Sequence, residues 1–157
     1  MVLAAAIAVE ESDSAAGQVL VGGGMTLASG GPVSMVQLVD LATGVCTPRL
    51  ALLHTHRLSA AARMPDARIV CAGGIVVNGA VQSTAEMWGL PEQGAVDAAW
   101  TWRALPAMGV GRYVCYRCVM RDGCFAVLGG WGIGIKHGPA QSHFSFRPSP
   151  VWCRQFT

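Results

Sequence analysis

Three glycine doublets, each closing a short apolar run, divide this 157-residue chain into units of similar length. The doublets are Gly23-Gly24, Gly73-Gly74 and Gly129-Gly130, and they recur at nearly equal intervals. A recurrence on this scale indicates one supersecondary unit that is used several times. The pattern therefore constrains the fold strongly and the function weakly.

The composition indicates a folded, turn-rich chain. Hydrophobic residues make up 52% of it and charged residues only 13%, which argues against disorder. Twenty glycines and eight prolines favour a β protein over a helical one. The net charge is only +2 and the basic residues are scattered, so no nucleic-acid partner is expected.

The apolar start and the cysteines bear on the compartment. The run at 1–9 lacks a positively charged leader and is far shorter than the ~20 residues that span a membrane, so it is interpreted as a strand and no membrane partner is expected. Four of the six cysteines, Cys46, Cys71, Cys118 and Cys153, lie in or beside apolar stretches. We interpret them as free buried thiols, which predicts a reducing compartment and a cytoplasmic location.

Apolar runs bounded by turn residues predict antiparallel strands in every unit. The expected strands are 3–9, 18–21, 35–41 and 46–50 in the first unit; 58–64, 68–72, 84–90 and a strand around Trp100 and Trp102 in the second; and 113–120, 124–128 and 144–146 in the third. The Asp122-Gly123 dipeptide is a strong hairpin signal. No helix is expected, because the alanine-rich stretch 59–62 matches the β-favouring stretch 116–119 of the next unit.

Other marker residues recur in the same order around the doublets. Arg57 precedes Gly73 by nearly the same spacing as Arg112 precedes Gly129. A tryptophan precedes the second arginine at Trp102, and Trp152 takes the same place in the third unit.

In the first unit Cys46 occupies the tryptophan position. The stretch 36–41 matches 85–90, where Gly89 replaces the aspartate found at Asp40.

This ordered set resembles the kelch repeat over residues 18–152. The best copy runs through Gly73-Gly74, Glu86-Met87-Trp88, Trp102, Leu105-Pro106-Ala107-Met108, Arg112, Asp122-Gly123 and Gly129-Gly130. The resemblance implies an all-β fold, a partial β-propeller of about two and a half to three kelch-type blades. It implies a single domain over 1–157, with units at about 1–50, 51–106 and 107–157.

The marker residues are expected to have structural roles. Paired glycines allow positive φ and close packing, a tryptophan fills the space between sheets, and a buried arginine needs acceptors. The structural kelch positions are Gly23, Gly24, Arg57, Gly73, Gly74, Glu86, Trp102, Arg112, Gly129, Gly130 and Trp152.

The number of blades presents a problem, because propellers typically close with four to eight. We favour a fragment of a longer propeller, or a truncated product, over a ring assembled from copies. Self-association through exposed blade faces is the other expected consequence, because an unclosed stack leaves apolar sheet faces uncovered.

Two groups of residues have metal-ligand character. Cys115 and Cys118, with Cys124 and His137 or His143 further on, suggest zinc, but positions three apart on a strand point to opposite faces.

His54 and His56 share one face of an extended segment, but no carboxylate lies within a few residues. They are interpreted as ordinary surface histidines. No metal and no cofactor is predicted.

Known catalytic motifs are also missing from the sequence. The glycine-rich stretch 129–134 is followed by no helix pattern and no Lys-Ser or Lys-Thr pair, so it does not predict a phosphate loop. No Gly-x-Ser-x-Gly elbow occurs. The chain is therefore expected not to be an enzyme.

The resemblance implies a protein-interaction module, a scaffold or substrate-recognition part of a larger assembly. Its partner would bind loops on one propeller face, here 26–32, 76–82 and 132–141. The alternative is a fragment of a propeller enzyme of the copper oxidase or sugar epimerase type. A copper oxidase needs converging tyrosine and histidine ligands, and Tyr113 and Tyr116 belong to no recognisable ligand motif.

Overall fold

A computed structural model of the chain describes residues 4–9, 17–28, 30–31, 33–76, 78–89, 100–132, 143–146 and 155–156, the last two ranges as backbone only. Every regular element in these ranges is a β-strand, and none of the described residues is helical. The prediction of an all-β chain is confirmed. The described part of the chain contains no helix that could span a membrane.

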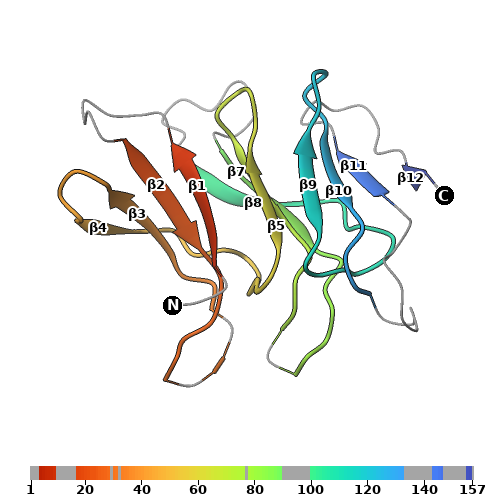
Figure 1. The fold of residues 1–157 in the computed structure, drawn as a ribbon, viewed down its shortest axis with the longest axis horizontal. Coiled ribbons are helices and arrows are strands. Elements are labelled where there is room, and N and C mark those ends of the chain that lie inside the picture. Colours follow the sequence, from red (N-terminus) through yellow and green to blue (C-terminus); the bar gives the residue numbers. More distant parts are fainter. Residues whose placement is uncertain are drawn as a thin grey trace.

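The strands form three antiparallel sheets that lie side by side along the chain (Figure 1). In each sheet the strands are neighbours in sequence order. The first sheet contains β1 (Ala5–Val9), β2 (Gln18–Gly22), β3 (Val36–Asp40) and β4 (Cys46–Arg49); the second β5 (Ala60–Arg63), β6 (Ile69–Ala72), β7 (Ala85–Gly89) and β8 (Thr101–Leu105); the third β9 (Tyr116–Val119), β10 (Phe125–Leu128), β11 (His143–Phe146) and β12 (Gln155–Phe156).

The three sheets share one register. Ala5 pairs with Gly22, Ala60 with Ala72, and Tyr116 with Leu128. These pairs define equivalent positions in the three sheets, because each joins the first residue of the first strand to the last residue of the second strand.

The outer strands follow the same register. Trp102 on β8 pairs with Trp88, and Cys46 on β4 pairs with Val39. Cys46 therefore stands at the position of Trp102, as the sequence spacing suggested.

The expected strands and the observed strands largely coincide, with three differences. The sequence pattern predicts strand starts at Leu58 and Tyr113, but β5 begins at Ala60 and β9 at Tyr116. Leu58 has a φ of 58° and Val114 a φ of 51°, so the chain turns sharply just before each strand. The predicted starts were wrong because neither residue type signals positive φ. The short β12 was not predicted.

Local turn chemistry explains the hairpins. The β9–β10 turn contains Gly123 at a φ of 77°, and the Asp122 carboxylate accepts a hydrogen bond from the Cys124 N–H (3.0 Å). In the β5–β6 turn the Met64 N–H donates to the Arg68 carbonyl (2.7 Å), and Asp66 pairs with the Arg68 side chain. The Asp-Gly turn was correctly predicted.

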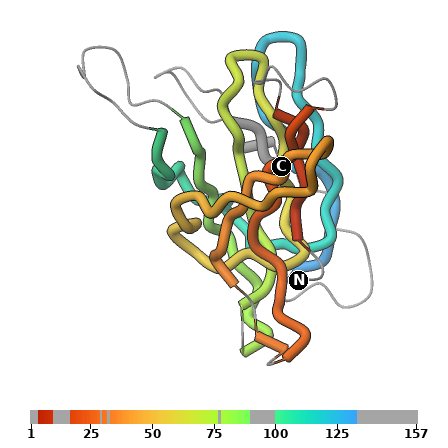
Figure 2. The backbone as a smooth tube through the Cα atoms, turned by 90° about the vertical axis from the view of Figure 1, so that its left-hand side faces the viewer, coloured from red at the N-terminus to blue at the C-terminus, as the bar shows by residue number. Residues whose placement is uncertain are grey.

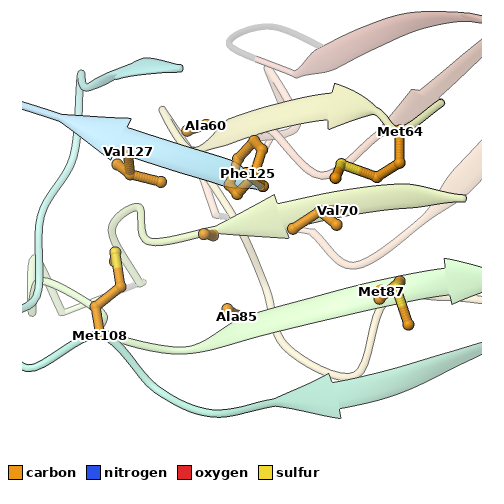
Figure 3. Close-up of a cluster of buried hydrophobic side chains, with 9 residues drawn as sticks. Ala60, Met64, Val70, Ala85, Met87, Met108, Phe125 and Val127 are labelled. Atoms are coloured by element: carbon orange, nitrogen blue, oxygen red, sulfur yellow. The ribbon is translucent and has the colours of Figure 1, made fainter. Parts of the chain in front are cut away.

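Apolar side chains fill the space between successive sheets. We call the contact between the first and second sheets the first seam, and that between the second and third sheets the second seam. The first seam buries Leu20, Val36, Leu52, Ala61, Ile69, Cys71 and Trp102. The second seam buries Ala60, Met64, Val70, Ala72, Ala85, Met87, Met108, Phe125 and Val127 (Figure 3). The first strands of the sheets, β1, β5 and β9, are consecutive neighbours across the two seams.

Candidate functional site

The glycine doublet of the second sheet lies directly against the chain that leads into the third sheet. Gly73 has a φ of 69°, and a Cβ at this position would lie 2.3 Å from the Arg112 carbonyl oxygen. The Gly74 N–H donates to that same oxygen (2.8 Å). Only glycine fits here, because both its backbone conformation and the contact exclude a side chain.

The doublet of the first sheet makes the same contact with a different residue. A Cβ on Gly23 would lie 2.3 Å from the His56 carbonyl oxygen, and the Gly24 N–H donates to it (2.6 Å). His56 and Arg112 each lie four residues before the first strand of their own sheet. They are therefore equivalent positions in the first and second seams.

The sequence spacing paired Arg57, not His56, with Arg112, and the backbone contacts correct this by one residue. Arg57 bridges to Ile75 in the same way as Tyr113 bridges to Trp131, so Arg57 is equivalent to Tyr113. The Arg57 Nη1 lies 3.6 Å from the Met25 sulfur.

The side chains of His56 and Arg112 also have equivalent bonds. The Arg112 Nη1 donates to the Gly129 carbonyl (3.0 Å), and the His56 Nδ1 donates to the Gly73 carbonyl (2.6 Å). Both residues are buried, with 2% of Arg112 and 1% of His56 exposed. In each seam a basic side chain therefore donates a hydrogen bond to the carbonyl of the first glycine in the following doublet.

Glu86 on β7 connects this arrangement to the first sheet. Its side chain is fully buried, and its Oε1 lies 2.6 Å from the His56 Nε2. Its two oxygens also accept the N–H groups of Leu53 (2.7 Å) and His54 (3.2 Å), which belong to the segment between β4 and β5. Glu86 therefore fixes the connecting chain to the middle of the second sheet.

These bonds determine the protonation of the pair. The Gly73 carbonyl can only accept, so the His56 Nδ1 carries a proton. Both Glu86 oxygens accept backbone N–H bonds, which favours the ionised carboxylate and places a second proton on the His56 Nε2. The pair is a buried imidazolium–carboxylate ion pair.

The shifts in the pKa values of His56 and Glu86 agree with a protonated His56 and an ionised Glu86. Burial opposes the charge on His56 most strongly, but Cys71, Glu86 and the Gly73 carbonyl together outweigh it and raise the pKa of His56 to about 10. Burial likewise opposes ionisation of Glu86, but hydrogen bonds from His56 and Leu53 hold the pKa of Glu86 below its ordinary value.

The same cluster has the residue types of a metal centre. Ligand atoms of His54, His56 and Glu86 all lie within 4.8 Å of one another. However, both His56 nitrogens and both Glu86 oxygens are already engaged in hydrogen bonds, and a metal would have to displace a proton from His56. The residues fit an ion pair better than a metal site.

The sequence pattern did not reveal this cluster. The interpretation of His54 and His56 as surface histidines is wrong for His56 and fits the half-exposed His54. No carboxylate lies close to the two histidines in the sequence, because Glu86 is 30 residues from His56.

The cysteine pair considered for zinc is divided by the fold. Cys115 is half-buried against the second seam and Cys118 is exposed. The interpretation of the cysteines in apolar stretches as buried is correct for Cys71 and wrong for Cys46 and Cys118, and Cys153 lies outside the described residues. His137 and the side chain of His143 lie outside the described residues, as does Trp152. Tyr116, one of the two tyrosines considered for a copper site, has 80% of its surface exposed.

Trp102 is buried in the first seam, and its Nε1 donates to the Leu50 carbonyl (3.0 Å). This side chain packs one sheet on the other and holds the end of β4 in place. Its surroundings give it an architectural role.

Two of the three loops expected to bind a partner lie at the same end of the sheets in both backbone views (Figures 1 and 2). In the β2–β3 loop the Thr26 N–H donates to the Gly31 carbonyl (3.0 Å), and Leu27 is 76% exposed. In the β6–β7 loop the Val76 N–H donates to the Ala80 carbonyl (3.0 Å). The expected third loop, 132–141, lies almost entirely outside the described residues.

Comparison of the sequence with known proteins does not assign the chain to a family. No protein-family model matches the chain, and no curated protein matches its sequence.

Proposed function

We propose that the chain is a partial β-propeller of about two and a half to three kelch-type blades, and that it binds a protein partner through the loops at one end of the sheets. The observation that carries the proposal is the repetition of one seam contact. Gly23 packs against the His56 carbonyl as Gly73 packs against the Arg112 carbonyl, and a Cβ added to either glycine would lie 2.3 Å from that carbonyl oxygen. Sheets related by one repeated contact are typical of stacked repeat proteins, whose loops emerge on common faces.

The loop end has the character of a binding surface. Both described loops are braced by internal hydrogen bonds, and the tip of one presents the exposed apolar Leu27. Rigid loops on a stable scaffold bind partners at a small entropic cost. The polar cluster at His56 and Glu86 is buried and engaged, which supports a structural role for it and a binding function without catalysis.

We also propose a cytoplasmic location. The described cysteines, Cys46, Cys71, Cys115, Cys118 and Cys124, are all thiols, and none of these five forms a disulfide. Reduced cysteines in this number are typical of a reducing compartment.

A comparative capture experiment tests the binding function. The chain is immobilised as wild type, as a loop variant with Leu27→Glu and Ala80→Glu, and as a control with Arg121→Glu at the opposite end. Circular dichroism verifies that all three are folded. We expect a protein that the wild type and the control retain equally and that the loop variant loses. Retention of the same proteins by the loop variant would contradict binding through these loops.

A further inference from the structure

Among the residues that the structure describes, the contact that repeats at the first two doublets is missing at the third. A Cβ on Gly129 would meet no described atom within 4 Å, although its φ of 62° matches those of Gly23 and Gly73. Trp131, at the position equivalent to Ile75, is 48% exposed whereas Ile75 is 8% exposed. Among the described residues, nothing occupies the place of a following sheet.

The face of the third sheet beside this position carries apolar surface. Tyr116 and Leu128 are cross-strand partners with 80% and 40% of their surfaces exposed, and Cys118 is exposed on the same face. Large exposed apolar side chains grouped in this way mark interaction surfaces.

The opposite end of the chain presents a face that suits this surface. By register, Ala6, Val19 and Val21 are equivalent to Ala61, Ile69 and Cys71, which form the second sheet's side of the first seam. The free face of the first sheet is therefore small and apolar at the same positions that already pack a seam inside the chain.

We infer that the free face of the third sheet binds the free face of the first sheet of a second copy, so that two copies close one ring of six sheets. The inference rests on the proposed propeller architecture, for which four to eight blades are typical. A head-to-tail contact that closes after two copies produces two identical seams.

The internal seams argue for this occupant. In the first seam Ala5 packs against the cluster that contains Ala61. Ala5 is equivalent to Tyr116 and Ala61 to Ala6, so a new seam of the same kind brings Tyr116 of one copy against Ala6 of the other. The interface thus continues a contact that the chain already makes with itself.

Sedimentation and light scattering of the purified chain test the inference. We expect a particle of twice the 16.4 kDa chain mass at micromolar concentration. Tyr116→Glu alone and Ala6→Lys alone are each expected to give a monomer, since each places an unpaired charge in both seams. Both side chains are exposed, so neither change should affect folding, which circular dichroism verifies.

Mixing the two variants distinguishes a closed ring from other dimers. In the mixed pair one seam joins the introduced carboxylate to the introduced ammonium, and the other seam joins native Tyr116 to native Ala6. We therefore expect a one-to-one heterodimer to form again. Leu27→Glu, at the loop end, is the control and should leave the dimer intact.

A wild-type chain that stays monomeric at 100 µM, dimers that survive Tyr116→Glu, a mixture that stays monomeric, or open-ended larger assemblies would each overturn the inference. Failure of the ring is distinguishable from failure of the proposed function, because loop-dependent capture of a partner does not require the second copy.

Discussion

His56 and Arg112 hold successive sheets together in the same way, although one is a histidine and the other an arginine. The backbone carbonyl of each receives the second glycine of the preceding doublet, and the side chain of each donates to the first glycine of the following one. The two residues thereby link three doublets, from Gly23 through Gly73 to Gly129, across both seams.

Replacing Glu86 should destabilise the protein strongly. Glu86→Gln leaves the His56 imidazolium buried without its carboxylate, and breaking a buried ion pair from one side costs about 3–5 kcal/mol. Asp66→Asn is the matched control, because it breaks a partly exposed ion pair with Arg68 and should cost below about 1 kcal/mol. Urea unfolding at a fixed protein concentration measures both. Equal losses in the two variants would contradict the role assigned to Glu86.

Stability should depend on pH through the same pair. The pKa of His56 rises from 6.5 in the unfolded chain to about 10 in the folded protein, so its contribution is complete below pH 6.5 and is lost as the pH rises towards 10. The pKa of Glu86 is lowered from 4.5, so its contribution is present above pH 4.5 and is lost as the pH falls through the folded pKa. The free energy of unfolding should therefore be largest between these limits.

Urea unfolding at pH 5.5, 7, 8.5 and 9.5 measures the alkaline decline. His54→Ala is the control, because His54 lies beside the pair but is half-exposed, and the decline should persist in it. A free energy of unfolding that stays constant from pH 6.5 to 9.5 would show that His56 is not held as an imidazolium.

Alanine substitutions at Gly73 and Gly129 separate the energetic cost of the left-handed backbone from the cost of close packing. Their φ angles are 69° and 62°, so alanine at either position costs about 1–2 kcal/mol for the left-handed backbone. Gly73→Ala must also displace the Arg112 carbonyl, which adds about 1–3 kcal/mol of overpacking, whereas Gly129→Ala meets no neighbour in the part of the chain that the structure describes. The comparison is made in the Tyr116→Glu background, which excludes the proposed second copy. Unfolding curves that show equal losses would contradict the seam geometry.

The strands were predictable because their signals are local. Apolar runs end at turn residues such as Asp122-Gly123, and the spacing of the doublets carries the register from one sheet to the next. The strand starts near Leu58 and Val114 were not predictable, since positive φ at a leucine or a valine is imposed by tertiary packing.

The buried pair of His56 and Glu86 could not be predicted from the sequence, for a different reason. His56 is followed directly by Arg57, and the similar spacing of the two arginines to the doublets after them made Arg57 the natural match for Arg112. The carboxylate partner, Glu86, is on a strand far along the chain, so only the folded arrangement brings the two together. The signal that could have found His56 is its spacing to Gly73, which equals the spacing from Arg112 to Gly129.

His56→Arg tests the equivalence of the two seams most directly. If His56 and Arg112 have the same role, an arginine at position 56 should donate to both the Gly73 carbonyl and Glu86. The variant should then keep most of the wild-type free energy of unfolding at pH 7. Its free energy of unfolding should no longer decrease between pH 6.5 and 10. His56→Ala, measured beside it, should lose several-fold more stability. An arginine variant that unfolds as readily as the alanine variant would contradict the account.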